Sequence, residues 1–295
     1  MTAPPQQLDL FAHSRDLMLR NDVLGALEQH DATGARAAWQ ALADAFAADP
    51  DLRALDLLTR ALEQRSETPL PDHDALARER LGLSHDLTTA ARQALGAAAG
   101  DAWLRPLWRA LAARSAGLPF QASRPDDHAA ALWLRGAHWG AAAQAVQGIE
   151  SWRRIPVPLA WMAEARCRLD GIDGCWALLT ELAWLSPGRL DALLRRLDDP
   201  LLARLHKRFG ATFEGSGEAA DLAWFPAWVL TETPALAPHL ALALPSQYSA
   251  AEQGMRLLLE LLGLERQGRH HELVQRRRAL RDLHAPLYAA YLATR

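Results

Sequence analysis

The chain has few of the residues that favour β-strands. Only 3 of its 295 residues are tyrosines, and isoleucine and valine are scarce beside leucine and alanine. Alanine and leucine lose little on entering a helix, whereas β-branched and aromatic residues prefer strands. The composition therefore disfavours a β-sheet and predicts an all-α protein. Lysine is almost missing too, with Lys207 the only one, which we interpret as a compositional bias toward arginine and not as a functional signal.

Cysteine is equally rare, which excludes a fold held together by disulfides. Cys167 and Cys175 are the only two, eight residues apart. We expect two buried free thiols, with a disulfide as the minor alternative. The formal net charge of −3 gives no general attraction to nucleic acid or to an anionic membrane. Any such contact would have to be local.

Long apolar runs are absent as well. The nearest candidate, Ala235 to Leu244, is interrupted by Pro238 and His239 and is too short for a membrane span. The first residues, MTAPPQQLDLFAHSRD, lack the basic start and apolar stretch of a signal peptide. We therefore expect a cytoplasmic protein.

Helical periodicity runs along the chain from Asp16 onward. Apolar residues repeat at spacings of three and four residues in the segments 35–46, 175–185 and 251–262, which lines one face of a helix each time. No segment alternates with a period of two. The Pro- and Gly-containing stretch 114–127 suggests a boundary near residue 122. We predict a flexible N-terminal tail over residues 1–12, an N-terminal helical half over 13–121 and a C-terminal helical-repeat half over 122–295.

Several helices are predicted in similar pairs. The segments 132–143 and 165–176 each read as a helix end, a turn and a new helix, and their turn glycines, Gly136 and Gly171, are 35 residues apart. Segments 29–39 and 266–274 are looser copies. The period resembles that of tetratricopeptide-type repeats, whose unit is about 34 residues. The resemblance implies an array of antiparallel helix pairs, in one piece or in two halves, that binds another protein.

Eleven tryptophans are many for this length. Most stand among small residues near the predicted helix joints, where a large ring fills the space between helices. Our interpretation is that they belong to the core, while one or two on the concave face are the alternative, as anchors for a partner.

Five residues near the N-terminus form a distinct motif. Gln7, Leu8, Asp9, Leu10 and Phe11 match at every position the pentapeptide Gln-Leu-Ser/Asp-Leu-Phe. In this they resemble bacterial replication and repair proteins that bind the polymerase sliding clamp. The motif lies beside the terminus, where a tail can reach a partner.

The resemblance implies a role for each residue of the motif. Leu10 and Phe11 would enter an apolar pocket of the clamp, Gln7 would anchor the segment through its amide, Leu8 would pack on the rim and Asp9 would face solvent. The alternative is a helix face, because Leu10, Leu17 and Leu24 are spaced by seven residues. The clamp-binding and helix-face interpretations are compatible if Ser14 caps the first helix and leaves the motif free.

The segment 266–281 is rich in arginine. Arg276, Arg277 and Arg278 are candidate contacts for DNA phosphates. The alternative is a solvated helix face, since no known DNA-binding motif surrounds them. Nucleic acid is therefore expected to be contacted only indirectly or weakly.

Signals for catalysis are poor. His270-His271-Glu272 lacks the spacing of a helical zinc site, and no Cys-x-x-Cys, phosphate-binding loop or Gly-x-Ser-x-Gly turn occurs. The doublets His73-Asp74 and His85-Asp86 lack visible flanking ligands. We predict no enzyme, no catalytic residue, no metal and no cofactor.

Taken together, the sequence predicts a cytoplasmic, non-enzymatic adaptor for replication or repair. Its helical-repeat body binds an unknown protein and its N-terminus binds the sliding clamp. One alternative is a clamp-independent scaffold or chaperone of a multiprotein assembly, because residues 24–58 also resemble the opening repeats of small secretion-system accessory proteins. Another is a helical hydrolase, which would need His73 and Asp74 to converge with further acids or histidines in a pocket.

Overall fold

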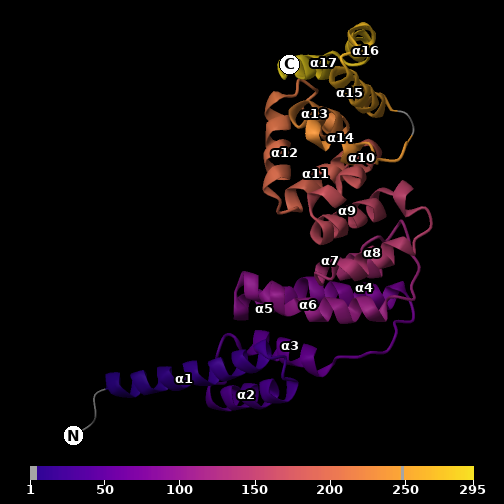
Figure 1. The fold of residues 1–295 in the computed structure, drawn as a ribbon. Helices are drawn as coiled ribbons and strands as arrows, with labels where there is room; N and C mark the ends of the chain where they lie inside the picture. The colour runs from indigo at the N-terminus through magenta and orange to yellow at the C-terminus, as the bar shows by residue number, and fades with distance from the viewer. Residues whose placement is uncertain (1–4, 247–248) are drawn as a thin grey trace. The chain divides into compact units, whose positions relative to one another are not determined.

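The computed structural model describes residues 5–246 and 249–295, and the side chains from Arg15 onward. Every regular element in these ranges is a helix (Figure 1). The chain divides into two compact units, residues 1–138 and 139–295. The prediction of an all-α protein built from helices packed in adjacent pairs is confirmed.

The first unit contains seven α-helices among its described residues. They are α1 (Pro5–Glu28), α2 (Ala32–Ala45), α3 (Leu52–Glu63), α4 (His73–Gly82), α5 (Thr88–Leu95), α6 (Ala97–Arg114) and α7 (Ala129–Arg135). A π-helical turn, η1 (Leu83–Leu87), joins α4 to α5. The most closely packed pairs are α1 with α2, α5 with α6, α2 with α3, and α6 with α7.

The turn between α1 and α2 is where the sequence predicted one. Asp31 caps α2 by accepting a hydrogen bond from the amide of Gly34 at 3.0 Å. In the predicted stripe of α2, Ala35 and Leu42 are fully buried. Ala38, Trp39 and Phe46 are partly buried and pack against the same core. The indole of Trp103 in α6 donates to the carbonyl of Leu27 at 2.7 Å, which attaches α6 to the end of α1.

The loop 115–128 lies inside the first unit and connects α6 to α7. The two helices pack together through Arg135, whose guanidinium lies over the ring of Trp108, and through Leu132, which is buried in the core of this unit. The predicted boundary at residue 122 thus falls within this loop, whereas the division between the units lies between His138 and Trp139. A loop with proline and glycine looked like a linker, but packed helices stand on both of its sides.

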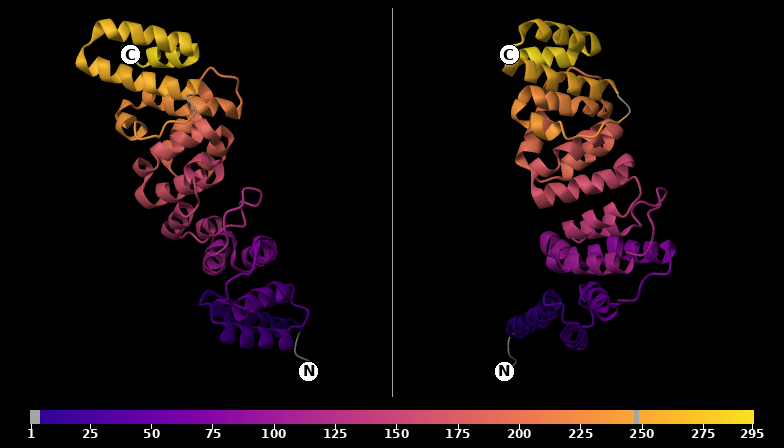
Figure 2. Two further views of the ribbon diagram at one scale, coloured as in Figure 1. Left: turned by 90° about the vertical axis from the view of Figure 1, so that its right-hand side faces the viewer. Right: turned by 45° about the vertical axis from the view of Figure 1, so that its right-hand side comes forward.

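The second unit begins with α8 (Trp139–Gln147) and α9 (Pro156–Asp170). Next come α10 (Trp176–Leu185), α11 (Pro187–Arg196), α12 (Pro200–Thr212), α13 (Phe225–Glu232), α14 (Ala237–Leu240), α15 (Ala250–Gln267), α16 (His270–Leu283) and α17 (Ala285–Ala293). Short 3-10 turns are interspersed, namely η2 (Trp152–Arg154), η3 (Ile172–Gly174), η4 (Ala219–Trp224) and η5 (Pro234–Leu236). The hairpin of α15 and α16 is plain in the left view of Figure 2.

The predicted apolar stripes of α10 and α15 form the core of this unit. Leu178, Leu179 and Leu182 of α10 are buried, as are Met255 and Leu258 of α15. The predicted turns at Gly171 and Gly268 are also present, and both glycines have a positive φ. Only glycine adopts this left-handed region without strain, so each is suited to end its helix.

All eleven tryptophans are buried or half-buried. Trp176 and Trp228 are among the largest fully buried side chains, and Trp228 packs edge-on against Phe209 with ring centroids 5.4 Å apart. The interpretation of the tryptophans as core residues is therefore confirmed for these rings.

Candidate functional site

The first helix is much longer than its partner. Helix α1 has 24 residues, α2 has 14, and a three-residue turn makes them antiparallel neighbours. Helix α2 can therefore accompany about fourteen residues of α1, counted back from Glu28. The ten residues by which α1 exceeds α2, residues 5–14, continue beyond it for about 15 Å at the rise of an α-helix. Figure 1 shows this end of α1 extending past α2 and α3.

The packing of α1 changes at the same place. Leu19, Val23 and Leu27 lie in or against the core of the first unit. Leu17 and Met18, one step nearer the N-terminus, are 56% and 63% exposed. The alternative interpretation put Leu10, Leu17 and Leu24 on one apolar helix face. Leu17 does belong to the helix, but its side chain is exposed.

An ion-pair cluster attaches the described part of α1 to the body near Arg20. Arg20 donates to Asp49 at 2.6 Å and lies 3.4 Å from Asp16 and 3.5 Å from Asp51. Burial of Asp49 opposes its ionisation, but the hydrogen bond from Arg20 holds the pKa of this carboxyl below its ordinary value. The same bond raises the pKa of Arg20. Sequence reasoning missed this cluster, because residues 29 positions apart carry no local signal of being neighbours.

The predicted motif from Gln7 to Phe11 falls within the extension of α1. Its backbone belongs to the helix Pro5–Glu28, and its side chains lie outside the described residues. The helix crosses the predicted limit of the tail at residue 12 and starts well before Ser14, so Ser14 does not cap it. Binding of the clamp by these five residues stays a prediction.

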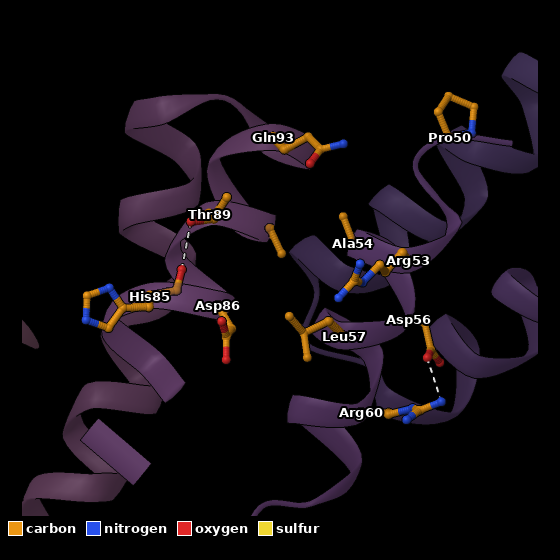
Figure 3. Close-up of a pocket in the computed structure, with 11 residues that line it drawn as sticks. Pro50, Arg53, Ala54, Asp56, Leu57, Arg60, His85, Asp86, Thr89 and Gln93 are labelled. Carbon is orange, nitrogen blue, oxygen red and sulfur yellow. Dashed lines mark hydrogen bonds and ion pairs between the residues drawn. The ribbon is translucent and has the colours of Figure 1, made fainter. Parts of the chain in front are cut away.

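A groove of about 650 Å³ lies between α3 and the η1–α5 segment (Figure 3). Its lining includes Ala54 and Leu57 of α3 beside several polar side chains. Across the groove, Arg53 of α3 faces Asp86 of η1, and both are exposed (Figure 3). Apolar side chains between opposite charges suit a polar peptide segment.

The π-helical turn shapes one wall of this groove. The hydroxyl of Thr88 donates to the carbonyl of Leu83, and that of Thr89 to the carbonyl of His85, both at 2.7 Å. Such turns are rare and occur frequently at functional sites. The letters Leu-Ser-His-Asp-Leu gave no sign of a π-turn, so this groove could not be found from the sequence.

The two His-Asp doublets are in different places. His85 lies at the groove, where its ring points away from α3 (Figure 3). His73 is buried at the start of α4, 2.9 Å from the carbonyl oxygen of Pro119 and 3.3 Å from the amide of Gln121. Asp74 pairs with Arg124 at 2.7 Å. His73 and Asp74 thus hold the loop 115–128 against α4.

No metal centre is assembled within residues 15–246 and 249–295. In this part of the chain, no three histidine, cysteine, aspartate or glutamate side chains are grouped so that they could hold an ion. His270 and His271 are exposed, and Glu272 of the same triplet pairs with Arg269.

The candidate phosphate contacts on α16 differ from one another. Arg276 pairs with Glu260 at 2.9 Å. Arg277 donates to the hydroxyl of Tyr291 at 3.0 Å and lies 3.4 Å from Glu265. Arg278 is exposed. Because the first two arginines are already paired with carboxylates, a phosphate would have to compete with these contacts.

Comparison with known proteins does not identify a family for this chain. No family model, curated protein or solved structure matches the chain. Within the described residues, no helix is both long and apolar enough to span a membrane.

Proposed function

We propose that this protein is a non-enzymatic adaptor that binds the polymerase sliding clamp through Gln7, Leu8, Asp9, Leu10 and Phe11, and carries another protein on its helical body. The observation that carries the proposal is the mismatch between α1 and α2, because the motif falls entirely in the ten residues that α2 does not accompany. A partner of α1 can thus be engaged without opening the core.

Binding in the extended form that the resemblance implies requires the first turns of α1 to unwind. This cost is small for two reasons. The first four amides of a helix have no partner within it, and a helical stretch of about ten residues that α2 does not accompany has only marginal stability of its own. Burying two side chains such as Leu10 and Phe11 contributes about 1.5–3 kcal/mol each. After the ordering costs, micromolar affinity is expected.

Weak binding of this kind suits a tether. The clamp would keep the adaptor near DNA while other clamp-binding proteins compete for the same pocket. The body would then present its own partner to that assembly, and the groove beside η1 is a surface that suits a peptide of that partner.

The test is a calorimetric titration of the purified protein against the sliding clamp. We expect micromolar binding by the natural chain and none by the double variant Leu10→Ala, Phe11→Ala. The matched control is Leu17→Ala, Met18→Ala, which removes two exposed apolar side chains from the same helix outside the motif and should bind as the natural chain does. Circular dichroism verifies that both variants keep their helices.

Either of two results would contradict the proposal. If the natural chain does not bind the clamp, the motif is incidental and a clamp-independent scaffold becomes the better account. If the control variant loses binding as fully as the motif variant, the exposed face of α1, and not the pentapeptide, is what the clamp contacts.

A further inference from the structure

Cys167 and Cys175 meet at the turn between α9 and α10. Cys167 is in the last turn of α9, and Cys175 is the N-cap of α10, directly after η3. Both are free thiols, and each shifts the pKa of the other. The thiol of Cys175 lies 3.3 Å from the carbonyl oxygen of Ile172, to which it donates. Helices α9 and α10 pack against each other on either side of the η3 turn, so the two reduced thiols are placed to form a disulfide.

The two thiols differ in accessibility. Cys167 is half-buried, whereas Cys175 is completely buried. A small reagent from solution therefore reaches Cys167 first. Cys175 can react only with a group that Cys167 already carries.

The surroundings also shift the pKa values of the two thiols in opposite directions. Interaction with Cys175 lowers the pKa of Cys167, helped by Arg168, against the opposing effects of burial, Asp199 and Glu164. The pKa of Cys175 is raised, first by its interaction with Cys167 and then by burial. The thiolate is the reactive form of cysteine, so nucleophilic character belongs to Cys167. Glu164 is engaged by Arg196, and Asp199 caps α12, so neither acid is available to accept the proton of Cys167.

We propose that Cys167 is a modification site for hydroperoxides and that Cys175 is its resolving thiol. The thiolate of Cys167 attacks the outer peroxide oxygen, the O–O bond breaks, and the alkoxide or hydroxide that leaves takes a proton from water. Cys167 is then a sulfenic acid. The sulfur of Cys175 displaces its hydroxyl as water, using the Cys175 proton, and a disulfide forms. Two thiols have lost two electrons, and one peroxide has gained them.

The second step is favoured by the first. The pKa of Cys175 is raised chiefly because a thiolate lies against it. Oxidation of Cys167 removes that negative charge, so Cys175 ionises more easily once its target has formed. The disulfide would join α9 to α10 across the η3 turn. The inference concerns the second unit and does not depend on clamp binding.

The experiment treats the reduced full-length protein with hydrogen peroxide, blocks remaining thiols with iodoacetamide and maps the products by mass spectrometry. We expect an intramolecular disulfide between Cys167 and Cys175, which dithiothreitol reverses. In Cys175→Ser, or Cys175→Ala if the serine variant misfolds, Cys167 should remain a sulfenic acid that dimedone traps. In Cys167→Ser, Cys175 should stay reduced at the same peroxide concentration.

The pH profile of alkylation provides a measurement that a merely structural pair would not alter. The rate at Cys167 should reach half its maximum below the pH expected for an ordinary cysteine thiol, and Cys175→Ala should move that midpoint upward. The proposal is overturned if peroxide gives only links between separate chains or no disulfide. It also fails if Cys175 oxidises in the Cys167→Ser variant as fast as Cys167 does in the natural chain.

Discussion

Single residues show where the packing of α1 against the first unit changes. Leu19 packs against the core, while Leu17 and Met18 are exposed. Arg20 holds this level of the helix to the loop after α2 through Asp49, whose side chain is 2% exposed. Beyond Asp16, no described side chain fixes α1 to its neighbours, and the proposed clamp-binding motif comes next along the helix.

The first prediction at this scale concerns Arg20. Replacing it with alanine leaves the buried carboxylate of Asp49 without its guanidinium partner, while the amide of Asp51 still donates to it. We expect the free energy of unfolding to fall by about 2 kcal/mol, the usual effect of losing a hydrogen bond to a charged group. Urea unfolding measures this. Arg15→Ala, at an exposed position of the same helix, should change the free energy by less than about 0.5 kcal/mol.

A second prediction concerns His128, which is buried and caps α7 by accepting a hydrogen bond from the amide of Ala130 at 3.2 Å. Burial, and to a lesser extent repulsion by His73, lowers the pKa of His128 to about 4. The unfolded chain therefore binds more protons between about pH 6.5 and 4. Stability is full above this window, is lost as the pH falls through it, and decreases by up to about 3 kcal/mol.

Urea unfolding at pH 7, 5.5 and 4.5 tests this for the natural chain and for His128→Asn. Asparagine keeps a capping acceptor but does not titrate. The variant should lose less stability between pH 7 and 4.5 than the natural chain, whatever its stability at pH 7. Equal losses would show that other groups, such as His284, whose pKa burial also lowers, carry the pH dependence.

At the scale of elements, the sequence predicted the helical class, several individual helices and the turns at Gly171 and Gly268. The stripes of α2, α10 and α15 follow from apolar spacing alone, because one face of each helix must be buried. The π-turn η1 and the groove beside it were not predictable, since they depend on how α4 and α5 pack onto other helices. Only part of the candidate site on α1 could be predicted. The motif itself was found in the sequence, but its position beyond the part of α1 that α2 accompanies depends on the lengths of the two helices.

The conformation of the α1 extension gives a third prediction. Proline at position 14 removes an amide that the helix uses and disfavours helix at residue 13, yet it suits the first turn of a helix that starts there. Ser14→Pro should leave residues 15–28 helical and release the motif from the helix. We expect the sliding clamp to bind this variant several-fold more tightly, because less unwinding is needed.

Calorimetry against the clamp measures that gain. Ser14→Ala is the matched control, because alanine favours helix. It should bind no more tightly than the natural chain. Weaker binding by the proline variant would indicate that the clamp recognises the motif as a helix, contrary to the extended form that the resemblance implies.

At the scale of the whole molecule, each unit is compact by itself. The first has a continuous core that runs from Val23 to Leu132, and it contains α1, the Arg20 cluster and the groove beside η1. The second contains the thiol pair and the arginines of α16. The sequence placed the boundary in the loop 115–128, because composition marks exposed loops but does not tell which loops also separate cores.

The last prediction follows from this division into two units. A fragment of residues 1–138 should fold alone, since it keeps its core and the caps of its helices, and it should unfold cooperatively in urea with a strongly helical circular dichroism spectrum. Because the proposed motif is in this unit, the fragment should bind the sliding clamp within about twofold of the affinity of the whole chain, a difference of under about 0.5 kcal/mol. A folded fragment that binds much more weakly would mean that residues 139–295 contribute to clamp binding, and a tether confined to α1 would then be the wrong account.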